Sequence, residues 1–307
     1  MHSRKKRDIL SPQYLFCYNM VWYGVQAWLW TTKFVEKDLP IFDKLQEIGY
    51  DGLEIDLGHP ESLPIDGIKY KMRETGVKCT FSVGLSKETD VSSSDPETRK
   101  RGIAYIKKLV DIASELESDV ICGILYAAWG EVDPKGRRPE KYEWAMECLR
   151  EAADYASQHG VTLALEPVNR FEGYLICTAE EMLDFVKRIN HPNVKVHLDT
   201  FQMNIEEDNL YKAIKRAGEY LYHVHLCENH RGIPGTGHIP WMDIFKALKE
   251  IGYNRWVVVE AWVHDVFLTE LGEIPPKIAM WRRLAPSGDI VAEQALKFLK
   301  EIEKKVA

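Results

Sequence analysis

Eight short apolar runs of β-strand character alternate with amphipathic helical stretches along the chain. The runs are "WYGVQAWLW" (22–30), "DGLEIDL" (51–57), "VKCTFSV" (77–83), "DVICGILY" (119–126), "VTLALEPV" (161–168), "VKVHLDTF" (194–201), "LYHVHLCE" (221–228) and "RWVVVEAW" (255–262). Most are apolar along nearly their whole length, as parallel strands are when helices cover both faces of the sheet. The alternation predicts a parallel α/β sheet, and eight such units that close on themselves would form a (β/α)₈ barrel.

The helical stretches carry the end signals expected of helices. Four of them end at a glycine that precedes the next strand, namely Gly49, Gly76, Gly160 and Gly252. An open, doubly wound sheet is the alternative, but no G-x-G-x-x-G follows the first run and no linker-like segment interrupts the series. We therefore predict one α/β domain, a single (β/α)₈ barrel over residues 21–307, after an N-terminal extension over residues 1–20.

Composition narrows the class of function. The 40 basic and 47 acidic residues give a net charge of −7, which argues against a nucleic-acid partner. No run of apolar residues is long enough to span a membrane. The six cysteines form no C-x-x-C pair, and the N-terminus lacks the apolar segment of a signal peptide. These features favour a cytoplasmic enzyme that acts on a neutral small molecule, without a membrane partner.

Four consecutive runs each end near a side chain that can bind a metal. The four ligand candidates are Glu166, Asp199, His225 and Glu260. In a (β/α)₈ barrel the active site lies at the carboxyl ends of the strands, so we expect them on one rim. Any one alone would more often make an ion pair or a backbone hydrogen bond, but four in register on adjacent strands favour a divalent cation. Three carboxylates and one imidazole suit Mn²⁺, Co²⁺ or Mg²⁺ better than a structural zinc ion.

The segment "HVHLCENHRG" (223–232) sets two histidines on one face of its strand, because side chains at i and i+2 point the same way. His225 is nearer the carboxyl end and is therefore the ligand candidate. We expect His223, one layer deeper, to be a buried, hydrogen-bonded histidine.

Two carboxylates beside one cation suggest proton transfer. If a carbonyl and a hydroxyl of the substrate bind the cation, the cation acidifies the neighbouring C–H by stabilising an enediolate. One glutamate can then remove the proton on one face and the other can return it on the opposite face. Glu166 and Glu260 fit this pairing.

Several motifs resemble the ketose 3-epimerase family, the D-tagatose and D-allulose 3-epimerases, within the xylose isomerase-like TIM barrels. The motifs are "LEPVNRFEG", "LDTFQMNIEE", "HVHLCENHRGIPGTGHIPW" and "VVVEAW". The resemblance extends from about Tyr23 to the C-terminus. It implies Mn²⁺ or Co²⁺ at the four ligand candidates, with the two glutamates as acid and base at C3 of a ketose. It also implies a homodimer or homotetramer.

The resemblance also implies residues that bind the substrate. Glu172 and Arg231 match positions that hold the O1–O2 end of the sugar, and Trp30 and Trp129 resemble aromatic residues of the pocket wall. Two positions depart from the family pattern. Gln202 stands where the family usually has a histidine, in "DTFHMN", and Gln26 stands where it usually has an aromatic residue.

The two glutamines leave the substrate open. A different lining favours, as an alternative to a free ketose, a related sugar isomerase, an inosose or keto-acid isomerase, or a lyase that acts on a 3-keto-glycoside. Glutamine can also make the same contact as histidine, without carrying charge. A DNA-cleaving relative is disfavoured by the net charge, and a non-catalytic sugar-binding barrel is disfavoured by the presence of both glutamates.

Overall fold

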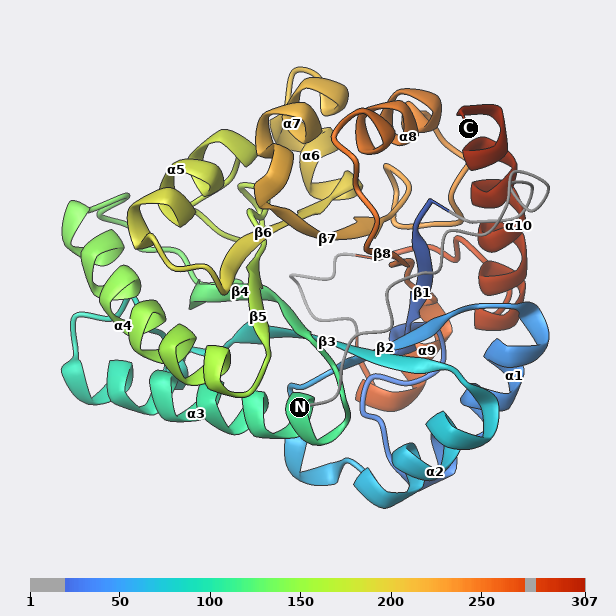
Figure 1. Ribbon diagram of the computed structural model, residues 1–307, viewed down its shortest axis with the longest axis horizontal. Helices are drawn as coiled ribbons and strands as arrows, with labels where there is room; N and C mark the ends of the chain where they lie inside the picture. The colour runs from blue at the N-terminus through green and yellow to red at the C-terminus, as the bar shows by residue number, and fades with distance from the viewer. Residues whose placement is uncertain (1–19, 274–279, 307) are drawn as a thin grey trace, which may run out of the picture.

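The computed structural model of the protein describes residues 20–273 and 280–306 and confirms the predicted (β/α)₈ barrel (Figure 1). Eight parallel strands close in sequence order, with β1 paired to both β2 and β8. The strands are β1 (Trp22–Gln26), β2 (Gly52–Asp56), β3 (Lys78–Leu85), β4 (Val120–Ala128), β5 (Thr162–Leu165), β6 (Val194–Asp199), β7 (Leu221–Leu226) and β8 (Trp256–Val259). Except for Met20, the predicted N-terminal extension lies outside the described residues.

Helices surround the strands on the outside of the barrel (Figure 1). The α-helices are α1 (Ile41–Ile48), α2 (Ile65–Thr75), α3 (Pro96–Glu115), α4 (Pro139–Gln158), α5 (Ala179–Ile189), α6 (Thr200–Glu206), α7 (Leu210–Ala217), α8 (Trp241–Glu250), α9 (His264–Leu271) and α10 (Gly288–Val306). Short 3-10 helices are η2 (Ala27–Leu29), η3 (Glu36–Asp38), η4 (Pro60–Ser62), η5 (Lys87–Thr89) and η6 (Gly218–Tyr220). Within the described ranges, no helix is both long and apolar enough to cross a membrane.

Local sequence signals account for the helix ends. Gly49 and Gly76 end α1 and α2 with φ of 94° and 76°, a left-handed conformation that glycine adopts at little cost. At the start of α3, Pro96 is the first helical residue, and the Asp95 carboxylate accepts hydrogen bonds from the backbone N–H groups of Glu97 and Thr98. These signals determine where the helices begin and end between the strands that carry the site.

The strands separate an apolar outer layer from a polar interior. In β2, Leu53 and Ile55 are fully buried in the apolar core, whereas Glu54 reaches across the barrel to His223 and His225 of β7. Because successive side chains of a strand alternate in direction, Glu54 must point inward while its two neighbours point toward the helices. The barrel interior therefore contains charged and imidazole groups beneath the carboxyl-end rim.

The first strand is shorter than predicted. The apolar run 22–30 predicts one strand, but β1 ends at Gln26 and the chain turns into η2. Beyond this turn the alternation of side chains no longer holds. Trp30 consequently points to α10, where its Nε1 donates a hydrogen bond to Asp289 Oδ1 at 2.6 Å.

Candidate active site

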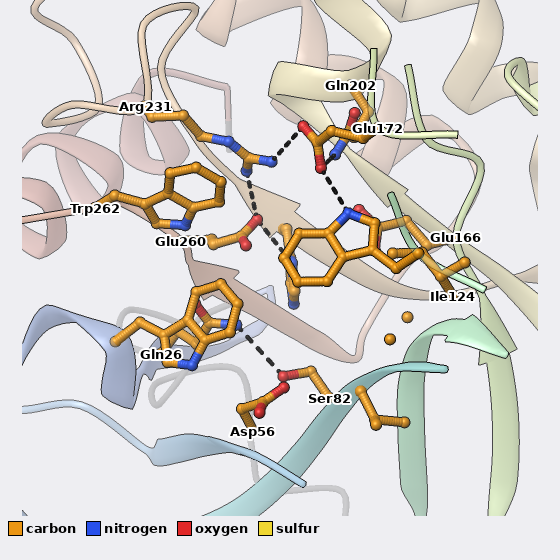
Figure 2. Close-up of a pocket in the computed structure, with 16 residues that line it drawn as sticks. Gln26, Asp56, Ser82, Ile124, Glu166, Glu172, Gln202, Arg231, Glu260 and Trp262 are labelled. Atoms are coloured by element: carbon orange, nitrogen blue, oxygen red, sulfur yellow. Dashed lines mark hydrogen bonds and ion pairs between the residues drawn. The ribbon is translucent and has the colours of Figure 1, made fainter. Parts of the chain in front are cut away.

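A pocket opens at the carboxyl ends of the strands, and most of the predicted site residues line it (Figure 2). The predicted residues that line it are Gln26, Trp129, Glu166, Glu172, Gln202, His225, Arg231 and Glu260. Asp199 lies behind this lining and contacts Arg231. Trp30 does not line the pocket, whose indole rings are those of Trp28, Trp129 and Trp262.

The four ligand candidates sit where the strands end. Asp199 is the last residue of β6, His225 is the penultimate residue of β7, and Glu166 and Glu260 directly follow β5 and β8. All four are more than nine-tenths buried. Nδ1 of His225 lies 3.2 Å from Glu260 Oε2. Among the described residues, two groups have ligand atoms within 4.8 Å of one another, namely Glu166, His197 and His225, and Glu54, Cys122, His223 and His225; Asp199 and Glu260 belong to neither group.

Arg231 links the carboxylates of the rim. Its Nη1 donates to Asp199 Oδ2 at 2.9 Å and to Glu260 Oε2 at 2.7 Å, and its Nη2 lies 3.5 Å from Glu172 Oε1. The guanidinium also lies over the ring of Trp262, 4.3 Å from the centroid. The backbone of Arg231 is left-handed, with φ of 63°, a strained conformation for a residue with a side chain. Arg231 thus combines a left-handed backbone with a guanidinium that contacts three carboxylates.

Burial and this arginine shift the acidities of the rim in opposite directions. Burial raises the pKa of Glu166 well above its ordinary value and that of Asp199 to about 7. Burial also acts on Glu260, but the charges of Arg231 and His225 outweigh it and lower the pKa of Glu260 to about 2. The rim thus holds buried carboxylates in different electrostatic environments.

The donor set fits a divalent cation. Three carboxylates and an imidazole are hard or borderline ligands, and a cation among them would offset the cost of burying charged oxygens. Such a cation would compete with Arg231 Nη1 for the oxygens of Asp199 and Glu260 that this nitrogen now contacts. The residues therefore form a possible metal site. In the structure, the positive charge of Arg231 balances the negative charges of Asp199 and Glu260.

A second polar layer lies beneath the rim. Nε2 of His225 lies 2.7 Å from Glu54 Oε1, and Nε2 of His223 lies 2.8 Å from Glu54 Oε2. Although burial opposes it, the two histidines hold the pKa of Glu54 well below its usual range, so Glu54 is an anionic acceptor. A proton on Nε2 of His225 leaves Nδ1 as the nitrogen that can bind a cation. The expectation that His223 is buried and hydrogen-bonded is confirmed.

Sequence reasoning missed Glu54 and His197, which lie inside strands rather than at their ends. The available signal was the alternation itself. His197 stands two residues before Asp199 on β6, and Glu54 stands between two apolar residues of β2. Both positions therefore point into the barrel, where a polar side chain needs a partner.

Glu172 forms a hydrogen-bonded cluster on one wall of the pocket. Its Oε1 accepts from Asn169 Nδ2 at 2.9 Å and faces Arg231, and its Oε2 accepts from Trp129 Nε1 at 3.1 Å and from Gln202 Nε2 at 3.3 Å. Gln202 in turn accepts from the backbone N–H of Asn169 through its Oε1 at 2.9 Å. Asn169, which sequence reasoning did not single out, is the hub that fixes both Glu172 and Gln202.

The opposite side of the pocket carries Gln26 and Ser82, while the Trp262 ring lies next to Arg231 (Figure 2). Trp28 also lines the pocket. Gln26 ends β1, and its Nε2 donates to Ser82 Oγ of β3 at 3.3 Å. The rings of Trp28 and Trp262 lie 6.0 Å apart between centroids. The correction to Trp30 follows from η2, which leaves Trp28 facing the pocket and turns Trp30 away from it.

The fold and this rim define a class. Residues 42–302 match the family described as xylose isomerase-like TIM barrel. Among solved structures, D-allulose 3-epimerase from Methylomonas sp. in complex with D-allulose superposes with a TM-score of 0.86 at 32% identity, and the match covers 92% of this chain and 96% of that one.

More specific similarity comes from individual enzymes. A D-psicose 3-epimerase of Ruminiclostridium cellulolyticum is 38% identical over 272 residues, which are 87% of this chain and 91% of that protein. The structure of D-psicose 3-epimerase with D-tagatose from Clostridium cellulolyticum H10 has a TM-score of 0.83 at 35% identity and covers 92% of this chain and 99% of its own. The chain belongs to the ketose 3-epimerase family within the xylose isomerase-like TIM barrels, and it is an enzyme of the isomerase class.

Proposed function

We propose that the protein is a metal-dependent sugar epimerase that interconverts the C3 epimers of a ketose. The observation that carries the proposal is the placement of two carboxylates, Glu166 and Glu260, from separate strands at one pocket next to His225. The relatives that support it are named for 3-epimerisation of D-psicose, D-allulose and L-ribulose.

Inversion at a carbon needs two proton-transfer groups. A single base that removed and returned the proton on one face would regenerate the starting sugar, whereas two groups on opposite faces of C3 give the epimer. In this proposal Glu166 and Glu260 exchange the roles of acid and base between the forward and reverse directions. Both are buried, and burial keeps bulk water away from the reacting carbon.

The other residues hold the sugar. Arg231 can donate hydrogen bonds to the oxygens at the O1–O2 end, and Glu172, fixed through both carboxylate oxygens, can accept from a hydroxyl there. A divalent cation held by the four ligand candidates, with Mn²⁺ the first choice and Co²⁺ or Mg²⁺ next, would supply the charge that stabilises the enediolate. His225 would use Nδ1 for that cation, because Glu54 holds its Nε2.

Solvent deuterium uptake tests the proposal. Metal-stripped protein is reloaded with Mn²⁺, Co²⁺ or Mg²⁺ and incubated in D₂O with a panel of ketohexoses and ketopentoses, which are then recovered and analysed by NMR. We expect deuterium at C3 together with the epimer. Label at C1 or C2 with an aldose would instead make the enzyme an aldose–ketose isomerase. No label in any sugar, with metal demonstrably bound, would exclude a free ketose as the substrate.

A further inference from the structure

Besides Arg231 Nε, three buried polar atoms of residues that line the pocket have no hydrogen-bond partner among the described residues. They are Gln26 Oε1, Trp28 Nε1 and Trp262 Nε1. All three residues line the pocket, and Gln26 and Trp262 are each only 2% exposed. A buried polar group without a partner destabilises a folded protein by roughly 1–3 kcal/mol, so three around one pocket require an explanation.

The amide of Gln26 is held in place. Its Nε2 donates to Ser82 Oγ, which fixes the side chain between β1 and β3 and leaves Oε1 as an acceptor without a donor. Trp28 is fixed as well, because its ring stacks on Trp129 with 6.1 Å between centroids and meets Phe267 edge-on at 5.8 Å. Rigid polar groups in the lining of a pocket are preorganised to bind a ligand.

Gln26 lies across the pocket from Glu172 and Arg231, whereas the Trp262 ring lies against the Arg231 guanidinium (Figure 2). A ketose whose O1–O2 end meets Glu172 and Arg231 therefore extends its distal carbons toward Gln26. The unpartnered atoms comprise one acceptor and two donors. A hydroxyl group can both donate and accept, so a polyhydroxylated chain complements this set, whereas an alkyl chain would leave all three unsatisfied.

The charges of the pocket select among hydroxylated substrates. Of the described residues that line it, Asp56, Glu166, Glu172 and Glu260 are carboxylates. The one guanidinium or ammonium group of the lining is that of Arg231, which already faces three carboxylates. A phosphate ester would bring two further negative charges among these carboxylates and would have to compete with them for Arg231.

We infer that Gln26, with the indole N–H group of Trp28, forms a subsite for the hydroxyl groups beyond C3 of an unphosphorylated ketose. The inference rests on the proposed function and deepens it, because it makes Gln26 a specificity-determining residue. The subsite binds the distal hydroxyl groups through hydrogen bonds, while the wall around Glu172 binds the O1–O2 end of the sugar.

Analogues that lack single hydroxyls test the subsite. The preferred ketohexose of the wild-type enzyme is compared with its 4-, 5- and 6-deoxy analogues, for the wild type and for Gln26→Leu, which keeps a similar volume. We expect Gln26→Leu to lower kcat/KM for the parent sugar about tenfold, the effect of one hydrogen bond. For the analogue that lacks the contacted hydroxyl, the wild type and the variant should be equal. An equal loss for every sugar, or no loss, would overturn the inference.

Trp28→Phe is the second variant, because it removes the indole N–H while it retains an aromatic ring. It should reduce kcat/KM for the parent sugar and for all analogues but one. Gln46→Leu, the same change as Gln26→Leu at an exposed position of α1, is the control for both and should change no sugar's kcat/KM. Thermal unfolding of each variant shows whether the fold is intact.

Binding separates failure of the subsite from failure of the proposed function. Calorimetric titration of the Mn²⁺-loaded protein with the same ketoses gives affinities without turnover. If no ketose is epimerised but binding still depends on Gln26 and on one hydroxyl, the proposed function fails and the subsite stands. If ketoses are epimerised and binding is indifferent to Gln26, the subsite is overturned and the function stands. If no ketose binds, both are overturned.

Discussion

The two walls of the pocket differ in how completely their polar atoms are paired. On the wall of Glu172, Arg231 and Gln202, both carboxylate oxygens of Glu172 and both ends of the Gln202 amide have partners, and Arg231 Nε is the buried atom there that has none among the described residues. On the wall of Gln26 and Trp28, a carbonyl oxygen and an indole N–H have none among the described residues. A completed network holds its geometry before a ligand arrives, whereas unpaired atoms gain their partners only from the ligand.

The difference suggests a division of labour. The paired wall surrounds the carboxylates proposed for chemistry, where a displacement of a fraction of an ångström costs rate. The unpaired wall contributes binding whose strength depends on which groups the substrate carries. Changes on the first wall should therefore affect every substrate, and changes on the second should affect substrates unequally.

The largest expected effect is on the paired side. Glu260→Gln removes a proposed acid/base group without changing its size, and we expect kcat to fall about 100- to 10,000-fold for every ketose, the usual contribution of general acid–base catalysis. The measurement is initial rate at saturating metal and sugar. Glu303→Gln, at another buried glutamate remote from the pocket, is the matched control and should leave kcat near the wild-type value.

Two outcomes of the Glu260→Gln experiment would contradict this prediction. If the Glu260→Gln variant, with metal binding confirmed, kept kcat within about tenfold of the wild type, Glu260 would not transfer the proton. If the loss were confined to one sugar, the two walls would not differ in the way proposed.

Metal binding should depend on pH. Burial raises the pKa of Asp199 to about 7, and Glu54 and Glu260 together overcome burial to raise the pKa of His225 well above its ordinary value. A cation needs Asp199 ionised and Nδ1 of His225 without its proton, so binding releases protons. We expect the affinity for Mn²⁺ to fall about tenfold or more per pH unit below pH 7. Calorimetry in buffers of different ionisation enthalpy counts the protons, and a count of zero would contradict the assignment.

Glu54→Gln should weaken metal binding although it replaces none of the four ligand candidates. The change replaces the anionic acceptor of His225 Nε2, and losing such support for a metal-binding histidine typically costs about 10- to 100-fold in affinity. Competition with a chelator of known affinity measures the change at pH 7. Thr80→Val, which removes a donor to Glu54 Oε2 and leaves His225 alone, serves as the control. An unchanged affinity in the Glu54 variant would make its role purely structural.

The sequence predicted the polar site residues at the strand ends better than those in the strand interiors. All eight strands were expected, and the four ligand candidates lie at or next to the ends of β5 to β8, because a metal-competent side chain late in an otherwise apolar run marks the carboxyl end of a barrel strand. Glu54 and His197 lie inside strands and were missed. Glu54 pairs with His225 of β7, far along the chain, and both ring nitrogens of His197, which lies near Glu166, have no hydrogen-bond partner among the described residues. Contacts across a barrel do not follow from local periodicity.

The aromatic wall shows a second limit. Alternation along the run 22–30 would have placed Trp30 on the same face as Gln26 and Trp28, and the 3-10 turn η2 breaks that rule. A turn of one residue triplet is too short to leave a pattern in an apolar segment. Two tryptophans, Trp28 and Trp30, lie close together in this segment. The hydrogen bond to Asp289 holds Trp30 away from the pocket.

The smallest expected effect concerns Gln202, which departs from the histidine usual in the family. Gln202 donates to Glu172 and accepts from the backbone N–H of Asn169 at the same time. A neutral histidine has one donor and one acceptor and can make both contacts, so Gln202→His should change kcat/KM by less than about tenfold. Gln202→Leu can make neither contact and should reduce it further. If Gln202→His instead altered the order of preference among ketoses, the paired wall would also read the substrate, and the two walls would share the control of specificity.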